Sequence, residues 1–151
     1  MKDIGFTHIA LPVTDLKKSY EFYSKYAGME TVHERPGVLW ISDKSRPFVI
    51  VLMEFEKVEN PLLPDAHIGV GVHSKAEVDR LCDLAKKDNC MISGPMDYGH
   101  PVGYWAFLKD PDDHTLEISY GQEDGLTVQR QPNPISNLPS HFLAGYASPT
   151  S

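Results

Sequence analysis

Three side chains that can bind a metal ion lie in segments that are predicted to be strands. His8 opens the apolar stretch HIALPV, His67 opens the similar stretch HIGVGV, and Glu117 lies in the alternating segment HTLEISY. Neutral imidazoles bind Fe, Mn, Ni or Zn, and a carboxylate adds the negative charge that holds a divalent ion. Three protein ligands on one ion would leave positions for water and substrate, as catalytic sites do.

The two His-Ile stretches begin two halves with the same order of predicted elements. In the first half we expect a strand, a helix and three strands, over residues 4–12, 16–26, 29–35, 38–42 and 47–56. In the second half we expect a strand, a helix after Ser74 and three strands, over residues 66–72, 75–85, 90–93, 104–109 and 115–120, with a polar loop at 94–103. Repetition of this kind is a fold-level signal.

The repeat is what would bring the candidate ligands together. If the halves pack about a pseudo-two-fold axis, His8 and His67 are equivalent and are expected to face one central cavity. Strand alternation puts Leu116 and Ile118 on the core face and Glu117 on the opposite, polar face. The alternative is that each histidine is an ordinary strand residue and that Glu117 lies on a solvated strand face.

Short signals mark the ends of the predicted elements. Thr14 or Asp15 can cap the first helix and Gly28 can end it. The segment NPLLPD at residues 60–65 is predicted to link the halves. Residues 122–151 are rich in Pro and Ser, and we expect a tail without regular structure, either docked or disordered.

The composition narrows the function classes. The chain has 151 residues, of which 41% are hydrophobic, enough for a packed core. The formal charge of −7 argues against nucleic acid as a partner. No apolar run approaches the roughly 20 residues of a membrane helix. The two cysteines, Cys82 and Cys90, fit no paired metal pattern and are interpreted as packing residues. A cytoplasmic location is expected.

Two segments resemble the vicinal oxygen chelate superfamily, which includes glyoxalase I, extradiol dioxygenases, and fosfomycin and bleomycin resistance proteins. They are HIALPVTDLKKSYEFY, residues 8–23, and FLKDPDDHTLEI, residues 107–118, in which Asp113 stands where glycine is common. The resemblance implies an α+β fold with two βαβββ modules, about 1–60 and 61–121, which form a curved eight-stranded mixed sheet around a metal-binding cleft. It implies His8, His67 and Glu117 as ligands of one divalent ion (Fe, Mn, Ni or Zn).

The subfamilies differ in residues beyond this ligand set. Glyoxalase I has a fourth ligand, a glutamate on the last strand of the first module, and spacing puts Val49 there; Glu54 or Glu56 could replace it only in a shifted register. Extradiol dioxygenases and fosfomycin-modifying enzymes have a tyrosine where this chain has Phe107. Each departure counts against the subfamily concerned.

The segment MDYGHPVGYWAF, residues 96–107, is predicted to line the cleft. His100 is a candidate general acid or base because its unperturbed pKa lies near neutrality, and Tyr104 is a candidate hydrogen-bond donor to a substrate oxygen. Trp105 or Trp40 could stack on a ring. The alternative is that these aromatic residues belong to the core and His100 to the surface.

The sequence therefore favours a metal-dependent enzyme that acts on a small substrate with adjacent oxygens. Glyoxalase-like lyase or isomerase chemistry is the first expectation, with His100, Tyr104 and Glu54 as candidate catalytic residues. An extradiol-type dioxygenase is the first alternative. A ligand-sequestering protein without catalysis is the second. A homodimer is expected, in which the cleft forms either within one chain or across a swapped dimer.

Overall fold

The computed structural model describes residues 5–122, which form two βαβββ modules. The first module consists of β1 (His8–Val13), α1 (Leu16–Ala27), β2 (Glu30–Arg35), β3 (Val38–Ser42) and β4 (Val49–Glu54). The second consists of β5 (Ile68–Gly71), α2 (Lys75–Lys87), β6 (Met91–Asp97), β7 (Tyr104–Lys109) and β8 (Thr115–Tyr120). The predicted α+β class and the internal duplication are confirmed. Apart from Gln122, the expected tail lies outside the described residues.

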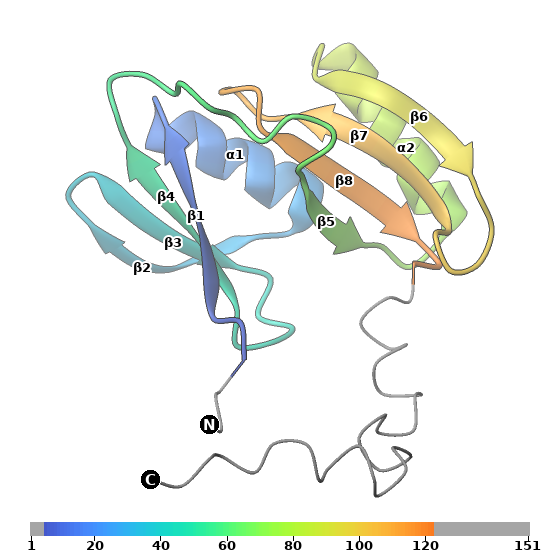
Figure 1. The fold of residues 1–151 in the computed structure, drawn as a ribbon, viewed down its shortest axis with the longest axis horizontal. Coiled ribbons are helices and arrows are strands. Elements are labelled where there is room, and N and C mark those ends of the chain that lie inside the picture. Colours follow the sequence, from blue (N-terminus) through green and yellow to red (C-terminus); the bar gives the residue numbers. More distant parts are fainter. Residues whose placement is uncertain (1–4, 123–151) are drawn as a thin grey trace, which may run out of the picture.

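The eight strands are divided between two four-stranded mixed sheets with the same topology (Figure 1). The first sheet has the order β1-β4-β3-β2 and the second has the order β5-β8-β7-β6. In each sheet the first strand of the module pairs in parallel with the last, and the remaining pairs are antiparallel. Among the described strands, β1 and β5 therefore each have one unpaired edge.

Capping residues fix the start of both helices and the end of α1. The Asp15 carboxylate accepts a hydrogen bond from the Lys18 backbone N–H, and the Ser74 hydroxyl accepts one from Glu77. Gly28 ends α1 in the left-handed conformation with a φ of 62°. Asp15, rather than Thr14, is thus the N-cap.

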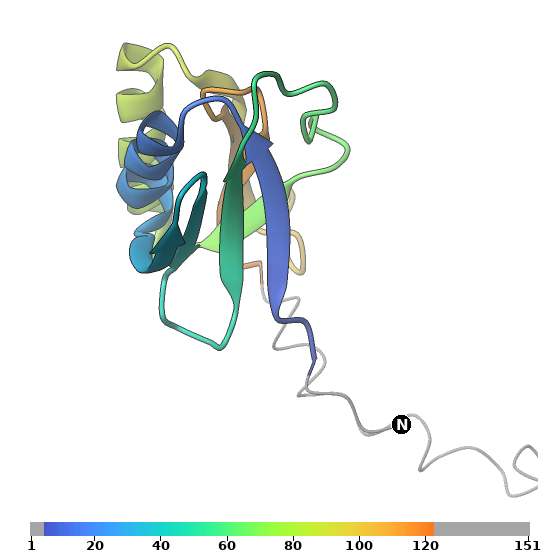
Figure 2. The ribbon, with the colours of Figure 1, turned by 90° about the vertical axis from the view of Figure 1, so that its left-hand side faces the viewer.

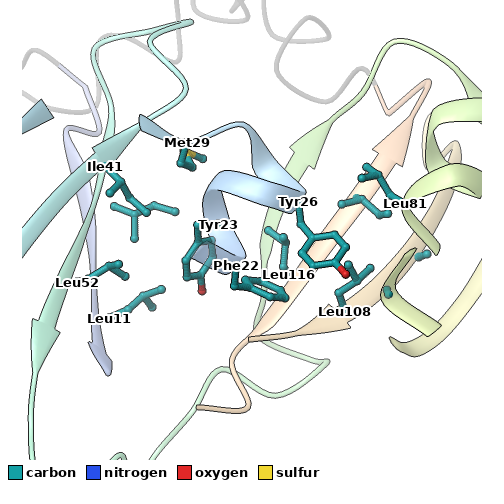
Figure 3. Packing of buried hydrophobic residues seen from close by; sticks show 14 of the residues in the cluster. Leu11, Phe22, Tyr23, Tyr26, Met29, Ile41, Leu52, Leu81, Leu108 and Leu116 are labelled. Carbon is teal, nitrogen blue, oxygen red and sulfur yellow. The ribbon is translucent and has the colours of Figure 1, made fainter. Parts of the chain in front are cut away.

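The core runs continuously through both modules because α1 packs on both (Figure 3). The buried residues of α1 recur at helical spacing and are Ser19, Phe22, Tyr23 and Tyr26. Figure 3 shows Phe22, Tyr23 and Tyr26 between Leu11 and Leu52 of the first sheet and Leu108 and Leu116 of the second. The two modules are therefore one packed unit.

Both helices cover the same side of the sheets (Figure 2). The helices and the core lie on one face of each sheet, and alternate side chains of each strand point to the opposite face. We call this opposite face, which carries no helix in the described part of the chain, the inner face. On β1 the inner face carries His8, Ala10 and Pro12, whereas Leu11 and Val13 are buried in the core. None of the helices within residues 5–122 is long and apolar enough to cross a membrane.

One predicted loop is partly a strand. β6 continues to Asp97, through Gly94 and Pro95, where a polar loop was expected. β6 is an edge strand, which tolerates proline, and one of the two register shifts in its pairing with β7 falls at this point, between Ser93 and Met96. Gly94 has a φ of 98°, and a Cβ there would lie 2.9 Å from the Ala106 Cα, so the close approach of β7 requires glycine.

Candidate metal centre

His67 and Glu117 meet at the start of the second sheet. His67 immediately precedes β5, and Glu117 lies on β8 opposite Gly69. The Nε2 atom of His67 is 3.5 Å from Oε2 of Glu117. Glu117 is buried, with 5% of its surface exposed, whereas the side chain of His67 is 32% exposed. A buried carboxylate therefore adjoins an imidazole that solvent and ligands can reach.

A backbone carbonyl orients the His67 ring. Nδ1 of His67 lies 2.9 Å from the carbonyl oxygen of Pro64. A carbonyl only accepts hydrogen bonds, so Nδ1 carries the proton and the neutral ring keeps its lone pair on Nε2. This is the usual arrangement for a histidine ligand, whose second nitrogen is held by an outer partner.

The pair suits a shared divalent ion. Donors bound at about 2.0–2.2 Å to one ion lie about 3.0–3.5 Å apart in tetrahedral or octahedral geometry, which is close to the observed separation. Gly69 leaves space beside the carboxylate, where a Cβ would lie in ordinary van der Waals contact, 3.7 Å from Oε1 of Glu117. The residue types and their spacing fit the metal that the family resemblance implies.

His8 lies on the other sheet. It is the first residue of β1, its side chain is exposed, and its Nδ1 is 3.0 Å from the hydroxyl of Thr7. Figure 1 shows β1 and β5 running in opposite senses, so the two strands begin at opposite ends. Within residues 5–122, no three His, Cys, Asp or Glu side chains form a group that could hold an ion. One chain thus brings together two of the three predicted ligands.

The register also locates the counterpart of Glu117 in the first module. Glu117 pairs with Gly69, two residues after His67, and Val51 pairs with Ala10, two residues after His8. The equivalent position is therefore Val51, whereas Val49 pairs with His8 itself. Both positions are apolar, so neither one supplies a fourth ligand.

Aromatic rings border the His67–Glu117 pair on β7. Phe107 lies opposite Glu117 in the sheet, and its ring centroid is 4.9 Å from that of His67. Trp105 follows on the same face, 4.6 Å from Phe107 between centroids, and both rings are half-buried. The Trp105 indole N–H is buried and has no hydrogen-bond partner among the described residues. The rings form an apolar wall beside the candidate centre.

The three predicted catalytic residues lie elsewhere. Tyr104 faces α2, where its hydroxyl donates to Asp79 at 2.6 Å, and this hydrogen bond raises the pKa of Tyr104 to about 12. His100 is exposed in the β6–β7 loop. Glu54 is exposed at the end of β4 and pairs with Val13, five positions along β1 from His8. Among these three residues, the described structure brings none into contact with His67 or Glu117.

Sequence reasoning missed the role of the segment before His67. NPLLPD was interpreted only as a linker, yet its Pro64 carbonyl fixes the tautomer of His67. The available signal was its closeness to the histidine, because a carbonyl three residues earlier is within reach of Nδ1.

The cavity between the modules does not include the two candidate ligands. It has a volume of about 720 Å³ and is lined by the β3–β4 loop, by β5 and by core residues such as Ile41 and Ile50. Neither His67 nor Glu117 is among its lining residues. On a single chain, solvent reaches the candidate centre through the partly exposed His67 side chain.

Comparisons with known proteins agree with this fold. A sequence model of the Glyoxalase/Bleomycin resistance protein/Dioxygenase superfamily matches residues 5–118. An uncharacterised protein of Pseudomonas aeruginosa is 35% identical over 85% of this chain and 96% of its own length. A trivalent organoarsenical cleaving enzyme of Bacillus sp. is 30% identical over 96% of this chain and 91% of its own length.

Solved structures share the architecture. The fosfomycin resistance protein FosX from Listeria monocytogenes, in a crystal structure with Mn(II) and sulfate, superposes with a TM-score of 0.67 at 22% identity. The match covers 85% of this chain and all of the FosX chain. At this identity the likeness concerns the fold.

Proposed function

Because the chain belongs to the Glyoxalase/Bleomycin resistance protein/Dioxygenase superfamily, we propose that it is a metal-dependent enzyme of the vicinal oxygen chelate type. Its reaction is of the lyase or isomerase kind and acts on a small substrate with two adjacent oxygens. The observation that carries the proposal is the oriented His67 imidazole 3.5 Å from the buried Glu117 carboxylate. The presence of Mn(II) in FosX and the bond-cleaving activity named for the Bacillus relative support it.

A second copy of the chain supplies the third ligand. His8 is exposed on β1, and β1 and β5 are both edge strands whose free edges can pair with another chain. In a two-fold dimer, β1 of one chain lies beside β5 of the other, and the reciprocal contact forms at the same time. Each of the two sites then has His67 and Glu117 from one chain and His8 from its partner.

The protein groups have distinct tasks in this proposal. Glu117 and the two imidazoles would hold the ion, which when bound would supply Lewis-acid polarisation of two neighbouring substrate oxygens. The Pro64 carbonyl keeps the Nε2 lone pair of His67 directed to the ion. The first sheet of the partner, which carries its His8, covers the open inner face and excludes water.

The apolar wall constrains the shape of the substrate. Phe107 and Trp105 lie beside the ligands, so the part of the substrate next to its oxygens is apolar or planar.

An arsenical substrate fits this centre less well. Soft thiolates are the preferred protein ligands of soft centres such as trivalent arsenic. Cys82 is buried in α2, and Cys90 immediately precedes the edge strand β6 and lies near Tyr26 of α1. Burial raises the pKa of both thiols, which disfavours the thiolate form.

The proposal is tested by metal content and turnover. The full-length, untagged chain is titrated with Fe²⁺, Mn²⁺, Ni²⁺ and Zn²⁺, and we expect about one ion per chain for at least one metal. His67→Ala and Glu117→Gln are expected to lose the metal while circular dichroism remains native, because both side chains lie on a sheet face outside the core.

The loaded protein is then given an α-hydroxy ketone probe and, separately, catechol with oxygen. Conversion of the α-hydroxy ketone without oxygen uptake supports the lyase or isomerase reaction. Cleavage of catechol with oxygen consumption overturns that reaction in favour of a dioxygenase. A folded protein that takes up none of the four metals overturns the enzyme and leaves the ligand-sequestering alternative.

A further inference from the structure

We propose that His114 is a positioning residue for the metal site: it holds the linker turn whose Pro64 carbonyl orients His67. The inference rests on the proposed function, because the orientation matters only if His67 binds a ligand. His114 is buried immediately before β8, outside the candidate centre, and acts through its hydrogen bonds to the backbone.

The two ring nitrogens of His114 have different partners. Nδ1 accepts a hydrogen bond of 2.9 Å from the backbone N–H of Leu62, and Nε2 donates one of 2.8 Å to the carbonyl of Pro12. A backbone N–H only donates and a carbonyl only accepts, so both partners select the same neutral tautomer. His114 is 1% exposed, which leaves little freedom for another ring orientation.

Leu62 begins a short path to the metal ligand. Its carbonyl also accepts a hydrogen bond of 2.6 Å from Thr115, so the backbone of Leu62 is tied on both sides to the start of β8. The next residues turn, with the Ala66 N–H donating to the Leu63 carbonyl at 2.6 Å. Pro64, in the middle of this turn, presents its carbonyl to Nδ1 of His67 at 2.9 Å.

The strand β8 therefore determines both the position of Glu117 and the orientation of His67. β8 carries Glu117 directly, and through His114 and Thr115 it anchors the turn that orients His67. The distance between Nε2 of His67 and Oε2 of Glu117 thus depends on one strand and one anchored turn. The hydrogen bond from His114 to the Pro12 carbonyl, in contrast, connects His114 to β1 of the first module. It plays no part in orienting His67.

Because the two nitrogens have separable roles, two variants separate positioning from general stability. In His114→Asn the side-chain oxygen can replace Nδ1 as the acceptor for Leu62, and the Pro12 contact is lost. In His114→Gln the side-chain amide can replace Nε2 as the donor to Pro12, and the acceptor for Leu62 is lost. Each variant loses one buried hydrogen bond, so the two are matched in their general cost.

The readout is Mn²⁺ affinity of the full-length chain by isothermal titration, with urea unfolding of each variant as the measure of stability. We expect His114→Gln to bind Mn²⁺ about 10-fold more weakly than the wild type, the lower end of effects of outer partners of metal ligands. We expect His114→Asn to bind within a few-fold of the wild type. Equal affinities in the two variants overturn the positioning role. A wild-type chain that binds neither Mn²⁺ nor another divalent metal overturns the proposed function instead.

A second measurement applies if a variant does not fold. Nitrogen-15 NMR of the metal-free wild-type chain, at a pH where the imidazoles are neutral, reports which ring nitrogen carries the proton. The inference predicts the Nδ1–H tautomer for His67 and the Nε2–H tautomer for His114. The opposite tautomer at either histidine overturns it.

Discussion

At the scale of single residues, Asp110 is a buried ionisable group whose carboxylate is surrounded by hydrogen-bond donors. Its carboxylate accepts hydrogen bonds from the Tyr23 hydroxyl and from the backbone N–H groups of Asp112 and His114. Burial nevertheless raises the pKa of Asp110 above its usual value of 3.8. The folded chain therefore binds this proton more tightly than the unfolded chain does.

This shift gives a pH-dependent prediction. Between pH 3.8 and the raised pKa, the folded state holds more protons, so the contribution of Asp110 to the free energy of unfolding falls as the pH rises. Asp110→Asn keeps the acceptor oxygen and removes the ionisation. We expect the stability of this variant relative to the wild type to increase as the pH rises through this window, measured by urea unfolding at a series of pH values. Parallel stability curves for the two proteins would contradict the assignment.

The sequence could place His67 and Glu117 on one face but could not orient their neighbours. Alternation along HTLEISY predicts the inner face of Glu117 because the neighbouring leucine and isoleucine are apolar. Tyr104 and Phe107 lie on opposite faces of β7, and which of them faces Glu117 depends on the register between β7 and β8. That register is a non-local property, so choosing Tyr104 rather than Phe107 could not be decided from the segment alone.

At the scale of elements, the turn between β7 and β8 explains a departure from the family pattern. Asp113 has a φ of 66°, the left-handed conformation in which a side chain is strained and glycine is not. Its position is where the family commonly has glycine. The turn therefore has the left-handed backbone conformation that glycine usually adopts, but with aspartate at this position. Aspartate is one of the few residues other than glycine that tolerate this conformation.

A pair of substitutions tests this account of the turn. Asp113→Gly and Asp113→Ala both remove the carboxylate that lies 3.4 Å from Lys109, so they differ only in backbone freedom. We expect the alanine variant to be less stable than the glycine variant by about 1 kcal/mol in the free energy of urea unfolding. Equal stabilities would show that the left-handed conformation is not maintained in solution.

The order of the elements was predictable, whereas the length of β6 was not. Helix caps and turns are local signals, so Asp15, Ser74 and Gly28 act where the sequence indicates. The local sequence at Gly94 and Pro95 also predicts a loop. In the structure β6 continues through them, because it pairs with β7 as an edge strand with a register shift.

At the scale of the whole molecule, the duplication is real but its two histidines remain apart within one chain. The modules pack through α1 and through contacts such as Tyr26 with Asp88 and Thr14 with Asp112. This packing leaves β1 and β5 as edges of separate sheets. The sequence could indicate equivalent histidines, but it could not decide whether they meet within a chain or between chains, because that depends on how whole modules associate.

The shared site of the dimer is the central claim, and a mixing experiment tests it most directly. His8→Ala and His67→Ala are each prepared as full-length chains and then unfolded and refolded together. A mixed dimer has one site with both substitutions and one with none, so random pairing restores about a quarter of the sites. The account predicts that neither variant alone binds the metal and that the mixture recovers about a quarter of the wild-type capacity. A mixture that binds no more metal than the separate variants would contradict a site built from two chains.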